Sequence, residues 1–202
     1  FVFASSAAGI DTYDPPAGLY YLIEHDVAAG VVTLRDRHQF RCVFRASDGR
    51  LLSCIDRNGN ATRCEYNGVG QLHRILDDRS QKYEISYYNH GRVYQVKDFV
   101  WDPLAPRVVT YLYDWQSGDL IEQTTPTTDR YSDGLTFKYF YDSNHRITRC
   151  SNPREYLENA VSPTPYLVNT WDAQGRVIKQ RLGETGQDIF VNYVTSTDVR
   201  IV

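Results

Sequence analysis

Hydrophobic and polar residues alternate one by one along much of the chain. Clear examples are Tyr83-Glu84-Ile85-Ser86-Tyr87, Thr110-Tyr111-Leu112-Tyr113 and Phe137-Lys138-Tyr139-Phe140-Tyr141. An alternation of period two that is rich in β-branched and aromatic residues is typical of β-strands with two different faces. No stretch follows a convincing helical period, so the pattern predicts an all-β protein.

Turn-forming segments interrupt these strands at regular intervals. Each starts with an aromatic residue, usually followed by Asp or Asn, and ends on a polar and an aliphatic residue. Six such segments occur: FRASDGRL (44–51), YNGVGQL (66–72), YNHGRV (88–93), YDWQSGDLI (113–121), YDSNHRI (141–147) and WDAQGRV (171–177). Their aromatic first residues are spaced by 22, 22, 25, 28 and 30 positions, and Tyr193 lies another 22 beyond the last. This spacing indicates about six tandem units and the beginning of a seventh.

A second turn falls about half a period after the first in the early units, at Asp56–Gly59, Asp77–Ser80 and Val96–Asp98. Two turns per unit leave two strands of roughly six residues each, so each unit is predicted to be a β-hairpin. The wider spacings contain insertions at this second turn: Asp102–Pro106, Pro126–Gly134 and Asn152–Pro165. Proline cannot donate to a β-ladder, so we expect loops at one rim of the sheet, where a recognition surface would lie.

The pattern divides the chain into two regions. Residues 40–202 contain the hairpin array, whereas residues 1–39 fit the period poorly. We expect residues 1–39 to form an atypical N-terminal segment that caps the array or takes part in assembly, because terminal units of repeat proteins are usually atypical. The opening Phe1-Val2-Phe3 is interpreted as part of a first strand rather than as the end of a signal peptide.

The motif strings, above all WDAQGRV, YDSNHRI and FRASDGRL, resemble the tyrosine-aspartate (YD) repeats of the Rhs (rearrangement hotspot) family. That family includes bacterial Rhs proteins, the C component of Tc toxins, wall-associated toxin proteins and the teneurin ectodomain. The resemblance covers about residues 40–202 and implies one long, curved or spiralling sheet of tandem antiparallel hairpins. In the family such a sheet forms a hollow shell, often around a toxic C-terminal domain. The residues that carry the motif, with an implied structural role, are Phe44, Gly49, Arg50, Tyr66, Gly70, Tyr88, Gly91, Arg92, Tyr113, Asp114, Tyr141, Asp142, Trp171, Asp172, Gly175 and Arg176.

The chain departs from the family pattern in two respects. A full shell needs far more repeats than these, so this chain alone is expected to form an open, curved sheet. The family's self-cleavage motif, DPxGL, has a superficial counterpart in Asp14-Pro15-Pro16-Ala17-Gly18-Leu19. That segment carries an extra residue and lies at the opposite end of the repeats, so we interpret it as an ordinary proline turn.

The charge balance narrows the classes of partner. The formal net charge is −3, the isoelectric point is near 5.9, and charges of both signs are interspersed. This pattern is typical of a solvated surface and argues against a nucleic-acid partner. No run approaches the ~18 apolar residues needed to cross a bilayer, so no membrane span is expected.

No residue pattern points to catalysis. The five histidines are not paired at ligand spacing, and the GxSxG elbow, the P-loop and the GxGxxG fingerprint are absent. The aspartates recur because the turns recur. We therefore expect no enzyme activity, no catalytic residue, no cofactor and no metal site.

The four cysteines follow the repeat register. Equivalent positions in successive hairpins are two strands, roughly 9–10 Å, apart, whereas a disulfide needs Cα atoms within ~7 Å. Cys42 and Cys54, across one hairpin, are the only short-range pair to consider. No CxxC motif is present, so a zinc site is not expected, and the cysteines are interpreted as small apolar core residues.

Three functional hypotheses follow. In the first, the chain is a structural section of an Rhs-type shell or of a secreted or surface protein. Its partners would then be further YD repeats, with an enclosed toxin domain implied by the resemblance. In the second, copies of the chain join through their exposed sheet edges into an extracellular filament. In the third, the rim loops or the aromatic side chains bind a glycan or a protein. The resemblance implies a secreted or cell-surface location.

Overall fold

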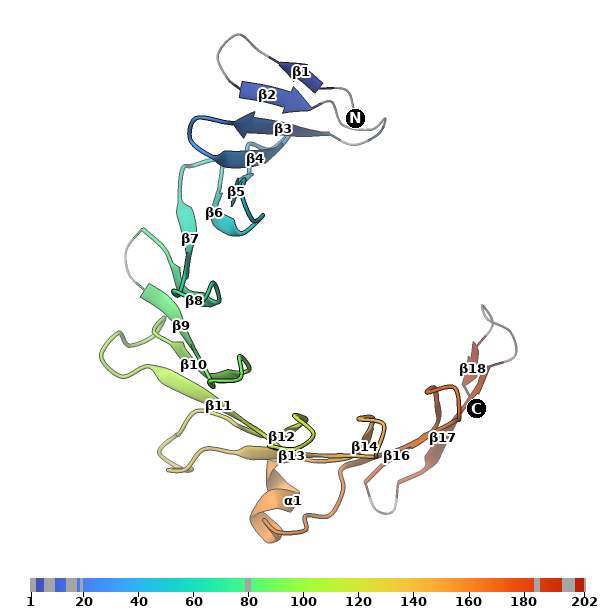
Figure 1. The fold of residues 1–202 in the computed structure, drawn as a ribbon. Coiled ribbons are helices and arrows are strands. Elements are labelled where there is room, and N and C mark those ends of the chain that lie inside the picture. Colours follow the sequence, from blue (N-terminus) through green and yellow to red (C-terminus); the bar gives the residue numbers. More distant parts are fainter. Residues whose placement is uncertain are drawn as a thin grey trace. The chain divides into compact units, whose positions relative to one another are not determined.

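The computed structural model describes residues 3–5, 10–13, 18, 20–78, 81–183, 186–193 and 199–201. These residues contain 18 β-strands and one short α-helix, which confirms the predicted all-β class of tandem antiparallel hairpins (Figure 1). Most of the Asp14–Leu19 turn, together with Phe1 and Val2, lies outside the described residues. The turn residues Arg79 and Ser80 also lie outside them.

The chain divides into two compact units, one formed by 1–86 with 97–106 and the other by 87–96 with 107–202. In the first unit, successive strands pair antiparallel in chain order from β1 to β9. Their bounds are β1 (Phe3–Ser5), β2 (Ile10–Tyr13), β3 (Tyr21–Asp26), β4 (Val31–Asp36), β5 (Arg41–Arg45), β6 (Leu51–Ile55), β7 (Ala61–Tyr66), β8 (Leu72–Leu76) and β9 (Gln81–Tyr87). The unit therefore continues the hairpin pattern into residues 21–36, which belong to the region that the sequence sets apart as atypical.

The second unit is built in the same way. Its strands pair antiparallel in chain order from β11 to β18. The bounds are β11 (Arg107–Tyr113), β12 (Leu120–Thr124), β13 (Thr136–Tyr141), β14 (Ile147–Ser151), β15 (Leu167–Trp171), β16 (Val177–Leu182), β17 (Asp188–Tyr193) and β18 (Val199–Ile201). Strand β10 (Val93–Asp98) has residues in both units.

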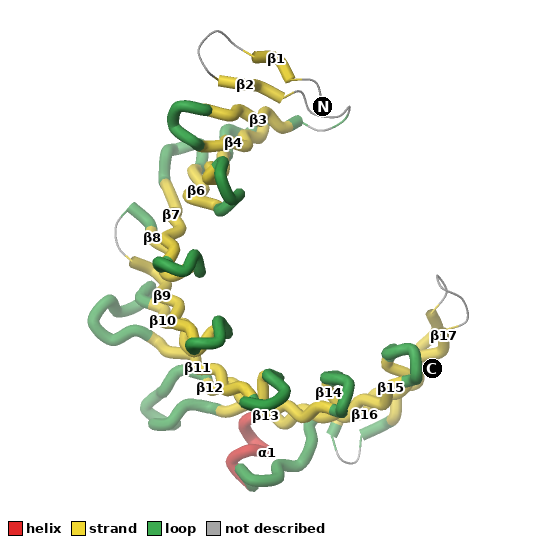
Figure 2. The backbone as a smooth tube through the Cα atoms, in the orientation of Figure 1, coloured by secondary structure: helices red, strands yellow, loops and turns green. Residues whose placement is uncertain are grey.

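Turns of two kinds alternate along the second unit. Short turns that begin with the aromatic-Asp motif join β11 to β12, β13 to β14 and β15 to β16. The connections from β12 to β13 and from β14 to β15 are longer and contain the predicted insertions (Figure 2). Because successive turns of an antiparallel sheet lie at opposite rims, the YD turns occupy one rim and these longer loops the other.

One loop contains a helix, so the expectation that no segment is helical was wrong there. Helix α1 (Pro153–Glu158) begins after the N-cap Asn152, whose side chain accepts a hydrogen bond from the backbone N–H of Arg154. The Glu155 side chain accepts one from the backbone N–H of Asn152, which completes a capping box. Six residues are too few to establish a hydrophobic period, whereas the Asn-Pro-x-Glu cap is readable from the sequence.

Neither unit has a conventional core. Among the residues whose exposure the structure describes, only Ala61, Ser151 and Pro163 are buried, and most strand residues are half-buried. A single-layer sheet explains this distribution, since each strand is covered mainly by the two strands beside it. Stability then comes from contacts between neighbouring hairpins.

Candidate functional site

The strand register of the second unit separates two chemically different faces. Residues that pair directly across antiparallel strands share a face. The face that carries the aromatic anchors, which we call the YD face, contains the register rows Tyr111–Gln123–Phe137, Tyr139–Cys150–Leu167–Leu182 and Asn169–Gln180–Ile189. None of these residues is charged.

The opposite face of the second unit contains acids and bases, and we call it the ion-paired face. Its rows are Leu112–Glu122–Lys138–Ser151, Phe140–Arg149–Val168–Arg181–Asp188 and Thr170–Lys179–Phe190. Glu122 pairs with Lys138 at 3.3 Å, and the Arg149 guanidinium lies 4.3 Å from the centre of the Phe140 ring. Most charges of these strands therefore lie on one side of the sheet, whereas Arg107, four residues before Tyr111 in β11, falls on the YD face.

The first unit repeats this separation. Its YD face contains the rows Ile23–Leu34–Cys42–Cys54–Thr62, His25–Val32–Phe44 and Cys64–Ile75–Tyr83. The opposite face contains the row Glu65–Arg74–Glu84, with Arg74 at 3.7 Å and 3.6 Å from the two carboxylates. A charged group does occur on this YD face at Asp11, which lies 3.9 Å from His25.

Four of the aromatic anchors are tied to the turn before them by a hydrogen bond. The acceptor is the carbonyl of the aliphatic residue that follows the preceding YD turn. The four bonds of this kind are Tyr66 Oη to Leu51 O (2.9 Å), Tyr141 Oη to Leu120 O (2.8 Å), Trp171 Nε1 to Ile147 O (2.9 Å) and Tyr193 Oη to Val177 O (3.1 Å). Tyr88 differs, because its hydroxyl donates forward to Tyr111 O at 2.9 Å. Each of these four bonds needs an aromatic residue with a donor at its tip, which Tyr and Trp provide and Phe does not.

The basic residue of the turn makes the second link between units. Its guanidinium lies over the ring of the next anchor, with ring-centre distances of 5.3 Å for Arg50 over Tyr66, 5.7 Å for Arg92 over Tyr113, 5.6 Å for Arg146 over Trp171 and 4.4 Å for Arg176 over Tyr193. Such cation–π contacts are favourable, the more so when the cation is partly desolvated. The motif thus holds one hairpin to the next as well as shaping its own turn.

Two turn glycines lie against the arginine of the preceding YD turn. Gly70 and Gly118 have positive φ angles of 84° and 76°, which favour glycine. A Cβ atom on Gly70 would also overlap the Arg50 guanidinium, and one on Gly118 would overlap that of Arg92. A Cβ atom at either position would therefore require the neighbouring guanidinium to move, in addition to the strain of the backbone angle.

The aspartate that follows the anchor organises the turn itself. Asp142 Oδ1 accepts the backbone N–H groups of Asn144 and Arg146, and its Oδ2 accepts the Arg146 side chain. Asp172 binds Gln174 and Arg176 in the same way. The hydrogen bond from the Arg146 side chain, followed by those from the backbone, lowers the pKa of Asp142. The backbone N–H of Arg176 is the main cause of the lowered pKa of Asp172.

The sixteen motif residues all lie in this arrangement of strands and turns. Phe44 pairs with Leu51 at the start of its turn, and Asp114 accepts the backbone N–H groups of Gln116 and Ser117. Gly49, Gly91 and Gly175 take positive φ angles of 72°, 90° and 79°. The structure brings these residues together as links between neighbouring hairpins rather than as one concave site.

Two features had no signal in the repeat pattern. His145 has a φ of 60°, and its Nδ1 lies 3.0 Å from an oxygen of Asp119 in the preceding YD turn. Asp119 stands where four of the other five turns have arginine, so at this turn the contact with His145 takes the place of the arginine–aromatic link. The other feature is Asp188 on the ion-paired face, with Arg181 Nε at 2.6 Å and Lys179 Nζ at 2.8 Å. Hydrogen bonds from Arg181 and then Lys179 lower its pKa from 3.8 to about 2.

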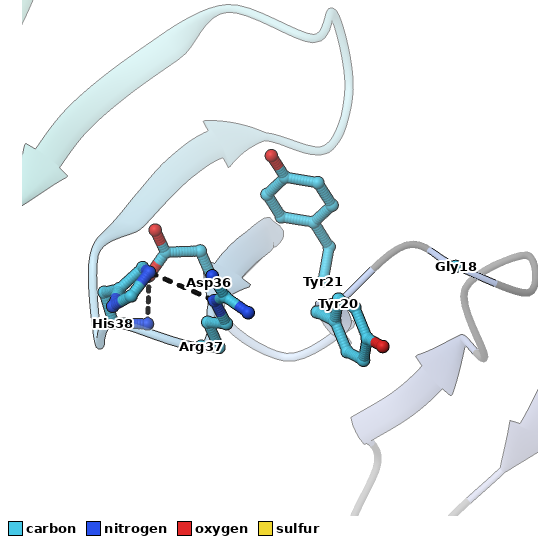
Figure 3. Close-up of a pocket in the computed structure, with 6 residues that line it drawn as sticks. All are labelled: Gly18, Tyr20, Tyr21, Asp36, Arg37 and His38. Carbon is cyan, nitrogen blue, oxygen red and sulfur yellow. Dashed lines mark hydrogen bonds between the residues drawn. The ribbon is translucent and has the colours of Figure 1, made fainter.

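A shallow hollow of about 310 Å³ lies beside the turn between β4 and β5 (Figure 3). It is lined by Gly18, Tyr20, Tyr21, Asp36, Arg37 and His38. The rings of Tyr20 and Tyr21 point in opposite directions, so they do not form a joint platform for a sugar ring. The Arg37 guanidinium lies 5.8 Å from the centre of the Tyr20 ring and so covers one face of that ring.

Two searches for other site types gave no candidate in the described residues. No group of three or more His, Cys, Asp or Glu side chains there is placed to hold a metal ion. Within that same part of the chain, no helix has the length and apolar character needed to cross a membrane.

Together the hairpins and their links define an all-β protein built from tandem, interlocked β-hairpins. Solved structures with a similar fold include a Tc holotoxin pore of Photorhabdus luminescens, with 13% identity, a TM-score of 0.46, and coverage of 91% of this chain and 12% of that chain. A second is TcdB2-TccC3 without its hypervariable C-terminal region, with 17% identity, a TM-score of 0.41, and coverage of 85% of this chain and 10% of that chain. A third is TcdB2-TccC3-TEV, with 12% identity, a TM-score of 0.42, and coverage of 95% of this chain and 14% of that chain. The chain thus spans about an eighth of the length of these proteins. No family model matches the sequence, and the search of curated proteins found no match.

Proposed function

We propose that this chain is a section of the wall of an Rhs-type shell and that it acts as a structural sheet rather than as an enzyme. The observation that carries the proposal is the link between successive YD turns. Three turns supply both a carbonyl and a guanidinium to the aromatic anchor of the next hairpin, as Ile147 and Arg146 do to Trp171. A unit of this kind extends by addition of further hairpins, because each one presents the same groups to its successor.

The two faces support an orientation for the wall. The register rows of the YD face in the second unit contain no charged residue, so covering them with other protein dehydrates no ion. The ion-paired face keeps its charges hydrated most easily when it contacts water. We therefore assign the YD face to the interior, toward an enclosed polypeptide, and the ion-paired face to the solvent.

The resemblance to YD repeats extends this proposal to partners and location. Further YD hairpins would pair with the terminal strands of the array, since open sheet edges offer unpaired N–H and C=O groups. A toxic domain would be the enclosed polypeptide. The assembly would act outside the cell or at its surface.

Cysteine labelling on the two faces tests the orientation. Leu182→Cys places a thiol on the YD face, and Phe190→Cys, at a residue 47% exposed, places one on the ion-paired face of the same unit. Both variants are treated with a maleimide on a long polyethylene glycol chain, once as the isolated chain and once in the protein as assembled in its source. Labelled peptides are identified by mass spectrometry, so the natural cysteines do not interfere.

In the isolated chain both variants should react. In the assembled protein only Phe190→Cys should react, because the reagent is too large to enter a closed shell. Reaction of both positions in the assembled protein would rule out a closed wall, and reaction of Leu182→Cys alone would reverse the orientation. Light scattering of the isolated chain is the control for edge-to-edge polymerisation, which would favour the filament hypothesis.

A further inference from the structure

Cys42 and Cys54 lie directly opposite one another on neighbouring strands of the YD face. Cys42 is in β5 and Cys54 in β6, and the register pairs them with each other. Their Sγ atoms are 3.1 Å apart, and both side chains are half-buried free thiols. Directly opposed residues of an antiparallel pair have Cα atoms about 4.5–5.5 Å apart, which falls within the range of about 4.4–6.8 Å that disulfides span.

The other two cysteines have no such partner. Cys64 pairs across the sheet with Ile75, and Cys150 with Tyr139 and Leu167. Cys54 faces Thr62 on β7, so Cys64 is only a diagonal neighbour, at a Cα distance of about 7–8 Å. That distance lies beyond the range of an undistorted disulfide. One pair among the four cysteines is therefore placed for bridging.

We propose that Cys42 and Cys54 are a thiol–disulfide exchange site, at which a small-molecule disulfide is reduced and a cross-strand disulfide forms between β5 and β6. One cysteine loses its proton to solvent and attacks a sulfur of the small disulfide, which releases one small thiolate and leaves a mixed disulfide. The second cysteine then loses its proton, attacks the protein sulfur of the mixed disulfide and releases the second thiolate. The protein loses two hydrogen atoms, and the small disulfide becomes two thiols.

The surroundings of the pair fit a site that stays reduced until such a reagent arrives. Burial, then the hydrogen bond and charge of Cys54, and then the Asp36 carboxylate raise the pKa of Cys42 to about 11. Near neutral pH this thiol remains protonated, and only a thiolate attacks a disulfide. The row neighbours Leu34 and Thr62 are uncharged and supply no cation that would stabilise a thiolate.

The test incubates the folded chain with glutathione disulfide, blocks the remaining thiols with N-ethylmaleimide, and maps the peptides by mass spectrometry. The expected product has lost two hydrogen atoms, retains two blockable thiols of the original four, and joins the peptides that contain Cys42 and Cys54. Amide exchange in β5 and β6 should slow after bridging. Cys64→Ser, the matched control, should give the same product.

Cys54→Ser should instead hold glutathione as a mixed disulfide on Cys42, or fail to react there, and should form no cross-link. Circular dichroism confirms that each variant is folded before treatment, and Cys54→Ala is a second variant if Cys54→Ser is not. A wild-type chain that carries only glutathione adducts, or a bridge that contains Cys64 or Cys150, would overturn the proposal. The labelling result for the two faces is independent of this outcome, since it concerns Leu182 and Phe190.

Discussion

At the scale of single residues, arginine is required at the end of a YD turn for reasons of shape. The Arg146 guanidinium binds three groups: Asp142 Oδ2 through Nε, Asp172 O through Nη1 at 3.0 Å, and the Trp171 ring through its face. A planar group can donate at its edge and stack on its face simultaneously, whereas the compact ammonium of lysine cannot. The residue that closes one turn is thus also the main contact to the next anchor.

We therefore expect Arg146→Met to reduce the free energy of unfolding by about 1–2 kcal/mol, because the apolar stem remains but the cation–π contact and charged hydrogen bonds are lost. Urea denaturation followed by tryptophan fluorescence measures the change. Arg154→Met is the matched control, since Arg154 is 82% exposed on α1, and should change stability by less than about 0.5 kcal/mol. Equal effects of the two substitutions would contradict the assigned role of Arg146.

His145 provides a second test at this scale, because it takes a positive φ where the other YD turns have glycine. We expect His145→Gly to be more stable than His145→Ala by about 1 kcal/mol, since only the alanine variant retains a Cβ in the left-handed region. The Asp119 contact is lost in both variants, so the comparison isolates the backbone. Urea midpoints of the two variants provide the measurement, and equal midpoints would show that the turn relaxes to another conformation.

The pKa values of three carboxylates predict how the stability of the folded chain depends on pH. Hydrogen bonds lower the pKa values of Asp142, Asp172 and Asp188 in the folded chain. Below the ordinary pKa of 3.8, the unfolded chain binds more protons than the folded one, so stability falls as the pH falls. The stabilising contribution of these carboxylates is complete above about pH 5. It is lost as the pH falls below 3.8, and for Asp188 the loss continues to about pH 2. Urea midpoints across this range should decline less steeply in Asp188→Asn than in the natural chain.

At the scale of elements, the loop from β14 to β15 is an independent structure built onto the ion-paired face. Lys138 on that face donates to Ala160 O at 3.1 Å, and the hydroxyl of the buried Ser151 donates to Thr164 O, also at 3.1 Å. The capping box at Asn152 starts α1 between these two attachments. The insertion therefore has its own hydrogen bonds and does not disturb the strands on either side.

Asn152→Ala should weaken the start of α1 by about 1 kcal/mol, because the N–H of Arg154 loses its acceptor. Amide exchange should accelerate in residues 153–160 and remain unchanged in the turn between β15 and β16. Limited proteolysis should show new cleavage in the same loop. Faster exchange throughout β13 to β16 would show instead that the loop supports the sheet.

At the scale of the whole molecule, stability is a sum of local terms. Only Ala61, Ser151 and Pro163 are buried among the residues described, so no central core couples distant strands. A substitution should therefore act on its own hairpin and the next, as in other repeat proteins. This is the behaviour expected of a sheet in which each hairpin is stabilised mainly by the hairpins beside it.

Asp188→Asn tests this expectation, because it breaks the ion pairs that join β16 to β17. Hydrogen exchange should accelerate in β16, β17 and β18 and remain unchanged in β3 to β6. In a protein with one cooperative core, the same substitution would raise exchange in all the strands. A uniform increase would therefore contradict the repeat-array description.

Much of this architecture was predictable from the sequence because its signals are local. The alternation at Phe137–Tyr141 identified a strand with two faces, and the turn residues of WDAQGRV identified where a hairpin reverses. The insertions 126–134 and 152–165 were correctly assigned to loops between strands. The turn predicted at 96–98 was wrong, because those residues are the end of strand β10. Helix α1 was missed because six residues carry no period, although the Asn152 and Glu155 cap was present.

The sequence by itself determined the strands, the turns and their repetition, since each depends on residues close together in the chain. Only the tertiary structure decided which residues meet across the sheet, because a shift of one position reverses the face of every side chain in a strand. That register places Cys42 against Cys54, His145 beside Asp119, and Arg146 over Trp171. It also places most strand charges on the face opposite the aromatic anchors, a separation that depends on how the strands pair.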